Sequence, residues 1–492
     1  MYNDDLYDMF SKITPDSSLK NKITDRIEGR EMKKSTVKHT SGAVILAAAI
    51  TAVLATTAFA MTPTGQETIC SIIAYFQNDH ATEMTSMEQL AKYNKEIGKS
   101  CSKDGITLTL DNVAADDNFI HVFYTVKSDG KPFYDGSDPK ATLYSDIVNM
   151  RANIQCVIDG KLAGFGTNHN TRDGYFADNY TYKAAEKYNI ASLQIPDSFK
   201  IELFGEVNES DEKESSEAFH KLYRDKYSEI TDEDKAGIWY LSADIDKSKV
   251  KVESVTREIN TKLPWTGSIV EKAVFSPFGN QLVVATETDN EGVYPFSVGG
   301  FALYDENDIC LDLLNTDLCG VGNDGSAKNA LEFLKADKDT KQLKFVPVKI
   351  NEVGDCGVTE NKIGQYPIVY KINNYGSVVV TDVRISDGQI AIDYYCDGFI
   401  LYDPGFQLLD DNGNNAEPGG KLGCVLYTDV HYDTNSYTAR YVYDKIDKNG
   451  NRVPPDESVS AESLKKSFTT LGVYNQSYIE LDFDNTVTVN LK

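Results

Sequence analysis

Histidine and cysteine, the side chains that most often bind metals or act as nucleophiles, are scarce in this sequence. Six histidines and eight cysteines are spread over 492 residues, and they form no H-E-x-x-H or Cys-x-x-Cys motif; a G-x-S-x-G motif is also missing. Aspartate and glutamate are too abundant to single out a catalytic pair. The sequence therefore predicts a protein that is not an enzyme, with no cofactor and no metal site.

The low density of cysteine excludes a small scaffold built on disulfides. An even number permits pairing, and buried thiols are an equal alternative, because the sequence does not give the connectivity. The eight are Cys70, Cys101, Cys156, Cys310, Cys319, Cys356, Cys396 and Cys424.

Basic residues are too few to balance the acidic ones. The chain has 49 Lys and Arg against 75 Asp and Glu, a net charge of −26, and after Thr40 the counts are 41 and 68. Such a polyanion is not expected to bind nucleic acid or anionic lipid head groups. We interpret the acidity as a means of keeping a surface protein soluble.

Long uncharged runs are absent, with one exception at residues 41–61, SGAVILAAAITAVLATTAFAM. At about 1.5 Å per helical residue this run crosses a bilayer core of about 30 Å. Basic residues cluster between Arg30 and Lys38, and none of the ten residues after Met61 is basic. The positive-inside rule then places the N-terminus in the cytoplasm. The prediction is a single-pass cell-membrane protein whose C-terminal part is extracellular.

A cleaved signal peptide is the alternative interpretation, because Ala58, Phe59 and Ala60 form an A-x-A site after an apolar run. The run exceeds the usual apolar region of about 7–15 residues, and the forty residues before it are more than export requires. We therefore favour the anchor. The alternative function that goes with cleavage is a secreted or surface-attached β-sandwich protein that binds a glycan, a peptide or the cell wall.

Residues 1–40 have the pattern of two short amphipathic helices, the second beginning at Thr14 and Pro15 and ending at Gly29. Two apolar stripes cannot bury themselves in forty residues, so they need either the membrane surface or a cytoplasmic protein. The residues predicted to bind such a partner are Leu6, Met9, Phe10, Ile13, Leu19, Ile23 and Ile27.

Beyond the membrane run, helices are predicted over Gln66–Gln77 and Ser86–Ile97, the latter ended by Gly98. A strand–turn–strand pattern then occurs three times. The copies are GITLTLDNVAADDNFIHVFYTV from Gly105, GSIVEKAVFSPFGNQLVVATET from Gly267 and GSVVVTDVRISDGQIAIDYYCD from Gly376. Each copy is expected to close on a further strand, beginning at Ser198, Lys341 and Ser477. The fold class predicted is mainly β, with two or three consecutive immunoglobulin-like β-sandwich modules.

These patterns divide the chain into six predicted parts. They are a cytoplasmic docking segment (1–40), a transmembrane helix (41–61), helices with a first β-sandwich (62–207), an acidic linker (208–237), a second β-sandwich (238–365) and a third (366–492). Within the linker, Phe219, Leu222 and Tyr223 suggest a short helix, but the segment is expected to be chiefly solvated.

Loops of two kinds carry weak functional signals. Gly320, Gly322 and Gly325 spell G-x-G-x-x-G, and a helix could follow over Ser326–Leu334, but no parallel βαβ unit surrounds them, so we interpret the motif as a loop. Acidic loops at Asp410–Asn414 and Asp447–Asn451 have calcium-ligand residue types without the spacing of an EF-hand. We interpret both acidic loops as hairpin turns.

The stretch LAKYNKEIGKSCSKDGITLTLDNVAADDNFIHVFYTV from Leu90 resembles a family of Gram-positive bacterial single-pass proteins. The family is grouped under a domain of unknown function and is regarded as a set of anti-sigma factors. The stretch SIVEKAVFSPFGNQLVV from Ser268 is similar to a companion immunoglobulin-like domain of the same proteins.

The resemblance implies a membrane-anchored regulator. Its cytoplasmic part would hold an extracytoplasmic-function sigma factor inactive, and its outer domains would sense conditions, or a ligand, in the cell envelope. The chain departs from the zinc-binding anti-sigma class, because no cysteine precedes Cys70 and no His-x-x-x-Cys-x-x-Cys motif occurs.

Overall fold

The structure is a computed structural model that describes residues 87–491, which belong to one unit, Ser71–Lys492. Within that range it leaves out residues 131–150, 163, 166–174, 179, 192–194, 209–215, 224–225, 249–252, 288–299, 322–325, 352–356, 402–403, 417–423, 444, 447–451 and 454–457. The predicted transmembrane run, the helix predicted at Gln66–Gln77 and the docking segment lie outside the described residues. Among the described residues, none of the helices is long and apolar enough to cross a membrane.

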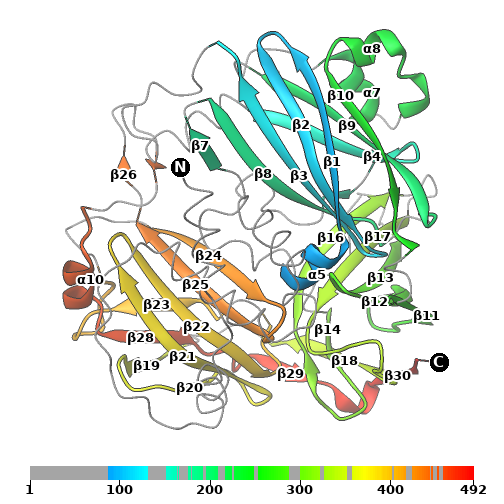
Figure 1. The fold of residues 1–492 in the computed structure, drawn as a ribbon. Coiled ribbons are helices and arrows are strands. Elements are labelled where there is room, and N and C mark those ends of the chain that lie inside the picture. The colour runs from blue at the N-terminus through cyan, green and yellow to red at the C-terminus, as the bar shows by residue number, and fades with distance from the viewer. Residues whose placement is uncertain are drawn as a thin grey trace, which may run out of the picture. The chain divides into compact units, whose positions relative to one another are not determined.

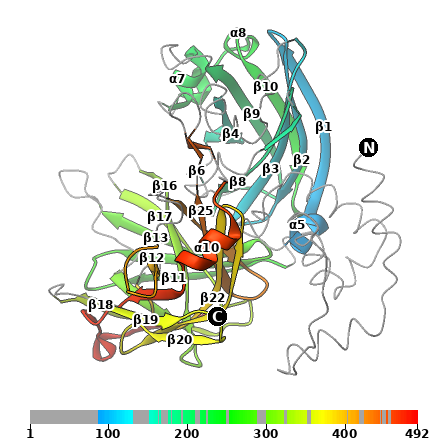
Figure 2. The ribbon, with the colours of Figure 1, turned by 90° about the vertical axis from the view of Figure 1, so that its left-hand side faces the viewer.

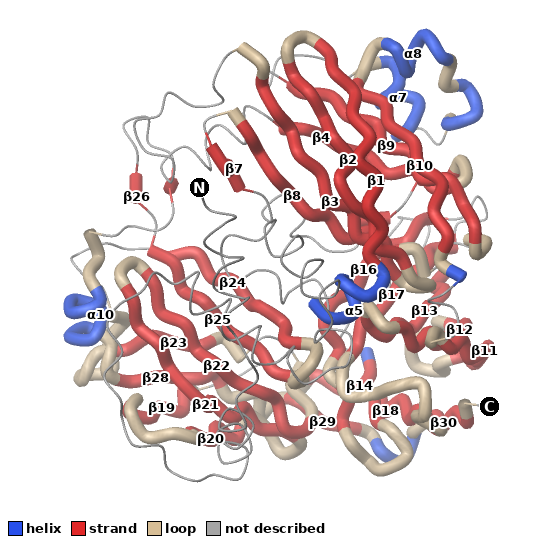
Figure 3. Tube along the Cα trace, in the orientation of Figure 1, coloured by secondary structure: helices blue, strands red, loops and turns tan. Residues whose placement is uncertain are grey.

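Strands dominate the described part, as predicted (Figure 3). They form three successive pairs of facing sheets, which we call the first, second and third sheet pairs. Each sheet pair contains one copy of the hairpin motif of the sequence, as the second and third strands of its five-stranded path. All three hairpins are confirmed as antiparallel pairs of neighbouring strands: β2 with β3, β12 with β13 and β21 with β22.

In the first sheet pair, one sheet has the order β1-β2-β3-β8-β6 with β7 beside β8, and the other has the order β10-β9-β4-β5 (Figure 1). Alternate residues of β2 and β3, such as Leu110 and Ile120, pack against Ile201 and Leu203 of β9 in one core. The strands are β1 (Asn94–Lys103), β2 (Ile106–Ala115), β3 (Phe119–Ser128), β4 (Arg151–Ile158), β5 (Lys161–Leu162), β6 (Gly164–Phe165), β7 (Tyr175–Asp178), β8 (Thr181–Asn189), β9 (Ser198–Asn208) and β10 (Trp239–Asp246).

In the second sheet pair, the order β11-β12-β13-β17-β16 faces β15-β14-β18-β29, with β30 beside β18. The core joins Phe275 and Leu331 of one sheet to Phe301 and Phe345 of the other. The strands are β11 (Val255–Lys262), β12 (Ile269–Ser276), β13 (Gly279–Glu287), β14 (Phe301–Tyr304), β15 (Cys310–Leu311), β16 (Leu313–Val321), β17 (Ser326–Phe333), β18 (Gln342–Ile350), β29 (Ile479–Leu481) and β30 (Val487–Asn490). The short 3-10 helix η5 (Phe483–Asn485) lies between the last two.

In the third sheet pair, β20-β21-β22-β25-β24 faces β19-β28-β23. Val380 and Ile392 pack against Phe406 and Leu471, and helix α10 (Ala461–Ser467) adds Leu464 to this core. The strands are β19 (Val358–Lys362), β20 (Ile368–Lys371), β21 (Gly376–Ser386), β22 (Gln389–Gly398), β23 (Phe406–Leu409), β24 (Cys424–His431), β25 (Ser436–Tyr443) and β28 (Thr470–Tyr474), while β26 (Lys445–Ile446) pairs with β27 (Arg452–Val453).

The helix predicted over Ser86–Ile97 is shorter than expected. Helix α5 covers only Met87–Tyr93, and the chain continues directly as β1. Gly98, predicted to end the helix, lies inside β1 at a φ of 62°, where the pairing with β2 shifts register between Glu96 and Lys99. Pairing along β2 outweighs the helical periodicity of this segment, and the glycine serves the bulge.

The predicted acidic linker differs from a solvated segment where it is described. Between β9 and β10 it contains α7 (Glu217–Tyr223), η2 (Tyr227–Glu229) and α8 (Asp232–Ala236), which lie beside β9 and β10 in both views (Figures 1 and 2). Phe219 is fully buried against Phe204 of β9. We call this segment the helical insertion. Because β10 pairs with β9, the first sheet pair extends past the predicted boundary at residue 207.

The ends of the other two predicted modules also differ. The strand expected to close the third module, from Ser477, instead adds β29 to β18 of the second sheet pair. Strand β19 lies before the predicted boundary at residue 365 but pairs with β28 of the third sheet pair. Alternation of residues predicts that these segments are strands, but their partners are set by long-range packing.

Candidate functional site

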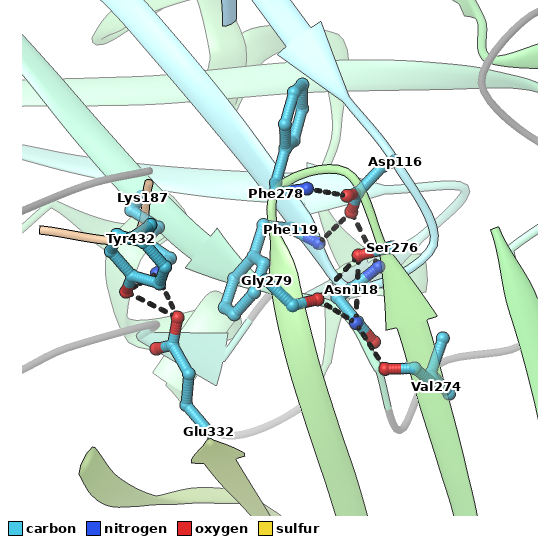
Figure 4. Close-up of polar contacts among 10 residues, drawn as sticks. All are labelled: Asp116, Asn118, Phe119, Lys187, Val274, Ser276, Phe278, Gly279, Glu332 and Tyr432. Atoms are coloured by element: carbon cyan, nitrogen blue, oxygen red, sulfur yellow. Dashed lines mark hydrogen bonds and ion pairs between the residues drawn. The ribbon is translucent and has the colours of Figure 1, made fainter. Parts of the chain in front are cut away.

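The structure brings polar groups from the three sheet pairs together at one place, which we call the junction, and most of these groups are buried (Figure 4). The β2–β3 turn contributes Asp116 and Asn118, the β12–β13 turn contributes Phe278 and Gly279, and Tyr432 follows β24. None of these side chains belongs to the predicted partner-binding set, all seven of which lie outside the described residues.

Asp116 connects the turns of two hairpins. Its carboxylate is fully buried and accepts hydrogen bonds at Oδ1 from the backbone N–H groups of Asn118 (2.7 Å) and Phe119 (2.8 Å). Oδ2 accepts the N–H of Phe278 at 2.8 Å, 162 positions along the chain. Burial raises the pKa of Asp116 to about 6, although the Ser276 hydroxyl and the three backbone donors oppose the rise.

Asn118 completes this connection. Its side-chain Nδ2 donates to the carbonyl oxygens of Val274 (3.0 Å) and Gly279 (2.7 Å) and to Oγ of Ser276 (2.9 Å). The turn of the first hairpin therefore satisfies backbone groups in the turn of the second, as a strand partner would.

A buried ion pair lies beside the two turns. Lys187 Nζ of β8 is 2.8 Å from Glu332 Oε1 of β17, and both side chains are almost completely buried. Tyr432 Oη donates to the same oxygen at 2.5 Å and lies 3.1 Å from Lys187 Nζ. The ammonium group also lies 3.9 Å from the centre of the Phe119 ring, a cation–π contact. One charge pair thus joins all three sheet pairs.

Gly279 leaves space for this arrangement. A Cβ atom at this position would lie 3.0 Å from Glu332 Oε1 and 3.2 Å from the Phe119 ring, and the φ of 139° is unfavourable for a residue with a side chain. The glycine therefore permits the close approach of the second hairpin to the first sheet pair.

Among the described residues, His121 and Gln281 near the junction are buried polar side chains for which no hydrogen-bond partner is found. His121 is fully buried, both ring nitrogens are unpaired, and its ring meets that of Phe278 edge to face at 5.1 Å. Burial, and then the charge of Lys187, lower the pKa of His121 well below its usual value. Gln281 lies opposite Glu332 on the neighbouring strand, and its buried side-chain amide likewise has no hydrogen-bond partner among the described residues.

A second polar contact joins the second and third sheet pairs. Lys335 Nζ lies 2.7 Å from Asp312 Oδ1 and donates to the carbonyl oxygen of Cys396 at 2.6 Å. Tyr437 Oη donates to Asp312 Oδ2 at 2.8 Å. Burial raises the pKa of Asp312, while Lys335 and Tyr437 oppose the rise. The sheet pairs are thus linked by paired charges as well as by apolar surface.

The first sheet pair also contains a buried acid in its core. Glu186 accepts hydrogen bonds from the hydroxyls of Tyr124 (2.8 Å) and Tyr188. Burial raises the pKa of Glu186 to about 7, and the two tyrosines oppose that rise. Cys156 is fully buried in the same core, and Cys310 is a buried thiol in the second sheet pair.

The loop motifs have structural roles where they are described. Asp410 accepts N–H groups of Asn412 (2.8 Å) and Asn414 (2.9 Å), and Gly413 has a φ of 78°, so this loop is a turn, as interpreted. The helix considered after the glycine motif is instead strand β17. Among the described residues, there is no group of three or more His, Cys, Asp or Glu side chains placed to hold a metal.

Sequence reasoning missed the junction, although one signal pointed to it. In β3 both alternating faces are apolar or aromatic, since Phe119, His121 and Phe123 face away from the core formed by Ile120 and Val122. A strand buried on both faces reads as a continuous apolar run. That pattern predicts that something covers the outer face, but it does not name the partner.

Comparisons with known proteins give one family match. A family model described as a domain of unknown function (DUF4179) matches residues 32–128, which end at the last residue of β3. No curated protein matches the chain. A solved structure described as the crystal structure of the conserved domain protein from Bacillus anthracis is 14% identical. It has a TM-score of 0.32, and the match covers 55% of this chain and 82% of that chain; a likeness at this level says nothing of function.

Proposed function

We propose that the chain is a membrane-anchored regulator of the anti-sigma kind. Residues 41–61 would span the cell membrane once, residues 1–40 would hold a sigma factor in the cytoplasm, and the β-rich part would sense conditions outside. The observation that carries the proposal is the uncharged run between a short amphipathic start and a large acidic exterior, with basic residues close before it and none among the ten residues after Met61. The match of residues 32–128 to a domain of unknown function covers the uncharged run and the first hairpin together, which agrees with the family resemblance of the sequence.

The cytoplasmic step is helix-in-groove recognition. The apolar stripes formed by Leu6, Met9, Phe10 and Ile13 and by Leu19, Ile23 and Ile27 would enter grooves on the sigma factor and fold on contact. A sigma factor held in this way cannot engage the transcription machinery with the same surface.

The outer part would act as the sensor. Immunoglobulin-like modules are part of this proposal, and the facing antiparallel sheets with a shared core agree with it. The polar contacts of Lys187 with Glu332 and Tyr432 connect all three sheet pairs, and a sensor that responds as one body is part of this proposal.

The test is to purify the tagged full-length chain from its native membrane and to identify the proteins that co-purify with it. We expect Met1 to be retained and a sigma factor to co-purify. Phe10→Asp and Ile23→Asp should abolish co-purification, because each places a charge in an apolar groove. Ser11→Asp and Ser18→Asp add the same charge away from the stripes and should leave it unchanged.

Two results would contradict the proposal. Cleavage after Ala60 would remove the cytoplasmic segment and favour the secreted binding protein instead. Retention of Met1 with equal binding by the Phe10→Asp and Ile23→Asp variants would end the groove model.

A further inference from the structure

Buried polar atoms that lack a hydrogen-bond partner are concentrated at the junction. In the part of the chain that the structure describes, twelve buried side-chain nitrogen and oxygen atoms have no such partner, and six of them belong to four junction residues. The six are Oδ1 of Asn118, both ring nitrogens of His121, both amide atoms of Gln281 and Oε2 of Glu332. A polar group buried without a hydrogen bond costs free energy, so native proteins rarely leave several together. The junction therefore calls for a hydrogen-bonding group that the described side chains do not supply.

Gln281 and Glu332 face the same way. They are directly opposite each other on the antiparallel strands β13 and β17, so their side chains lie on one face of the sheet. Their neighbours Leu282 and Leu331 point into the core of the second sheet pair, which places Gln281 and Glu332 on the outer face. Both side chains are fully buried there. The unpaired amide atoms and Oε2 thus lie inside the junction and not at the protein surface.

His121 lies on the other side of the junction. It is directly opposite Lys187 on the antiparallel strands β3 and β8, and its neighbour Ile120 points into the core of the first sheet pair. Lys187 Nζ in turn lies 2.8 Å from Glu332 Oε1. His121 and Gln281 therefore flank one buried ion pair, the histidine from the first sheet pair and the glutamine from the second.

The unpaired atoms select the kind of molecule that fits them. Glu332 Oε2 accepts hydrogen bonds, whereas the Gln281 amide and a neutral His121 ring each offer a donor and an acceptor. A cation at this place would lie close to the Lys187 ammonium group, and an anion would lie close to the Glu332 carboxylate. An apolar molecule would leave every polar atom unpaired. Water is small and neutral, and it both donates and accepts hydrogen bonds.

We propose that the junction is a binding site for ordered water, with molecules that bridge Glu332 Oε2, the Gln281 amide and the His121 ring. The first and second sheet pairs are then linked by bound water as well as by the direct contacts of Lys187. A water bridge is nearly as favourable in enthalpy as a direct hydrogen bond, so a polar junction of this kind is not a weak one. The proposal does not depend on what residues 1–40 bind.

The direct test is a crystal structure of the full-length chain at a resolution that shows ordered water. We expect water density at about 2.7–3.2 Å from Glu332 Oε2 and from an amide atom of Gln281. A direct hydrogen bond between the Gln281 amide and Glu332 Oε2, with no water beside them, would overturn the proposal. Density for a metal ion or an anion at this place would overturn it as well.

A second test counts the slowly exchanging buried waters of the full-length chain in solution, by magnetic relaxation dispersion of the water oxygen nuclei. Gln281→Met keeps the length of the side chain but removes both amide atoms, and His121→Phe removes both ring nitrogens. Each should lower the count by about one. Gln476→Met is the matched control, because Oε1 of this buried glutamine already accepts the backbone N–H of Leu401 at 3.0 Å. It should leave the count unchanged.

The two junction variants are measured independently, so one that fails to fold leaves the other, and the crystal structure needs neither. A count that stays the same in every junction variant that folds would overturn the proposal. An equal fall in Gln476→Met would also overturn it, because the loss would then not be specific to the junction.

Discussion

Lys187 and Glu332 are 145 positions apart in the sequence, yet they form a buried ion pair of 2.8 Å between the first and second sheet pairs. The pair has little access to water, so each charge depends on the other and on the Tyr432 hydroxyl.

Removing one partner of this pair should destabilise the protein strongly. Lys187→Met or Glu332→Leu leaves the other charge buried and unpaired, at a cost of about 3–5 kcal/mol in the free energy of unfolding. The double variant should recover most of the loss. Denaturant unfolding of the full-length chain measures this, and an additive double variant would rule out the coupling.

A matched pair provides the control for that experiment. Lys328 and Glu271 are also 2.8 Å apart in the second sheet pair, but their side chains are 42% and 28% exposed. Lys328→Met should therefore change the free energy of unfolding by only about 0–1 kcal/mol. A similar loss at both pairs would show that burial does not set the difference.

Gly279→Ala should destabilise the junction through contact and backbone strain together. The added methyl group would meet Glu332 Oε1 at 3.0 Å and the Phe119 ring at 3.2 Å. We expect a loss of about 2–4 kcal/mol in thermal or denaturant unfolding. Gly267 also has a positive φ, of 74°, but no atom of the described residues lies within 4 Å of its Cβ position, so Gly267→Ala should lose only about 1 kcal/mol. Equal losses would argue against the close approach.

Local pattern was enough to predict the strands but not their assembly. The three hairpins were predictable because each has alternating residues on either side of a polar turn. The partner of β29 was not, since a three-residue strand, Ile479–Leu481, has no local feature that selects β18. The repeat in the sequence therefore indicates three modules without fixing where each one ends.

The junction could not be predicted from local sequence patterns either, because its contacts join segments that are distant in the sequence. Asp116 and Asn118 have the residue types of any hairpin turn, and Lys187 resembles any outward lysine of a strand. Only the fold shows that their partners, Phe278, Gly279 and Glu332, come from a different sheet pair. In the helical insertion, Phe219, Leu222 and Tyr223 predict the short helix that is observed, but the acidic composition around them does not show that this helix packs against β9.

The helical insertion should resist proteolysis because Phe219 anchors it. Trypsin sites at Lys221 and Lys226 lie in or beside short helices that a solvated linker would leave open. Phe219→Ala removes a fully buried ring, costs about 3 kcal/mol locally and should speed cleavage on the order of a hundredfold. His220→Ala, on the same helix but only half-buried, should leave the rate nearly unchanged. Rapid cleavage of the unaltered chain at these lysines would restore the linker interpretation.

Glu186 should make the first sheet pair more stable in mild acid than at neutral pH. Burial raises its pKa to about 7 in the folded state, above the ordinary value of 4.5. Between these values the folded chain keeps a proton that the unfolded chain releases, so stability is full below about pH 4.5 and declines as the pH rises toward 7. The loss should reach roughly 3 kcal/mol, and Glu186→Gln, which cannot ionise, should abolish this component.

Unfolding at about pH 5 and about pH 8 measures this pH-dependent component of stability as the difference between the unaltered chain and the variant, with Glu217→Gln on helix α7 as control. An unchanged pH dependence in Glu186→Gln would mean that the two tyrosine hydroxyls, from Tyr124 and Tyr188, keep the carboxylate ionised in the fold.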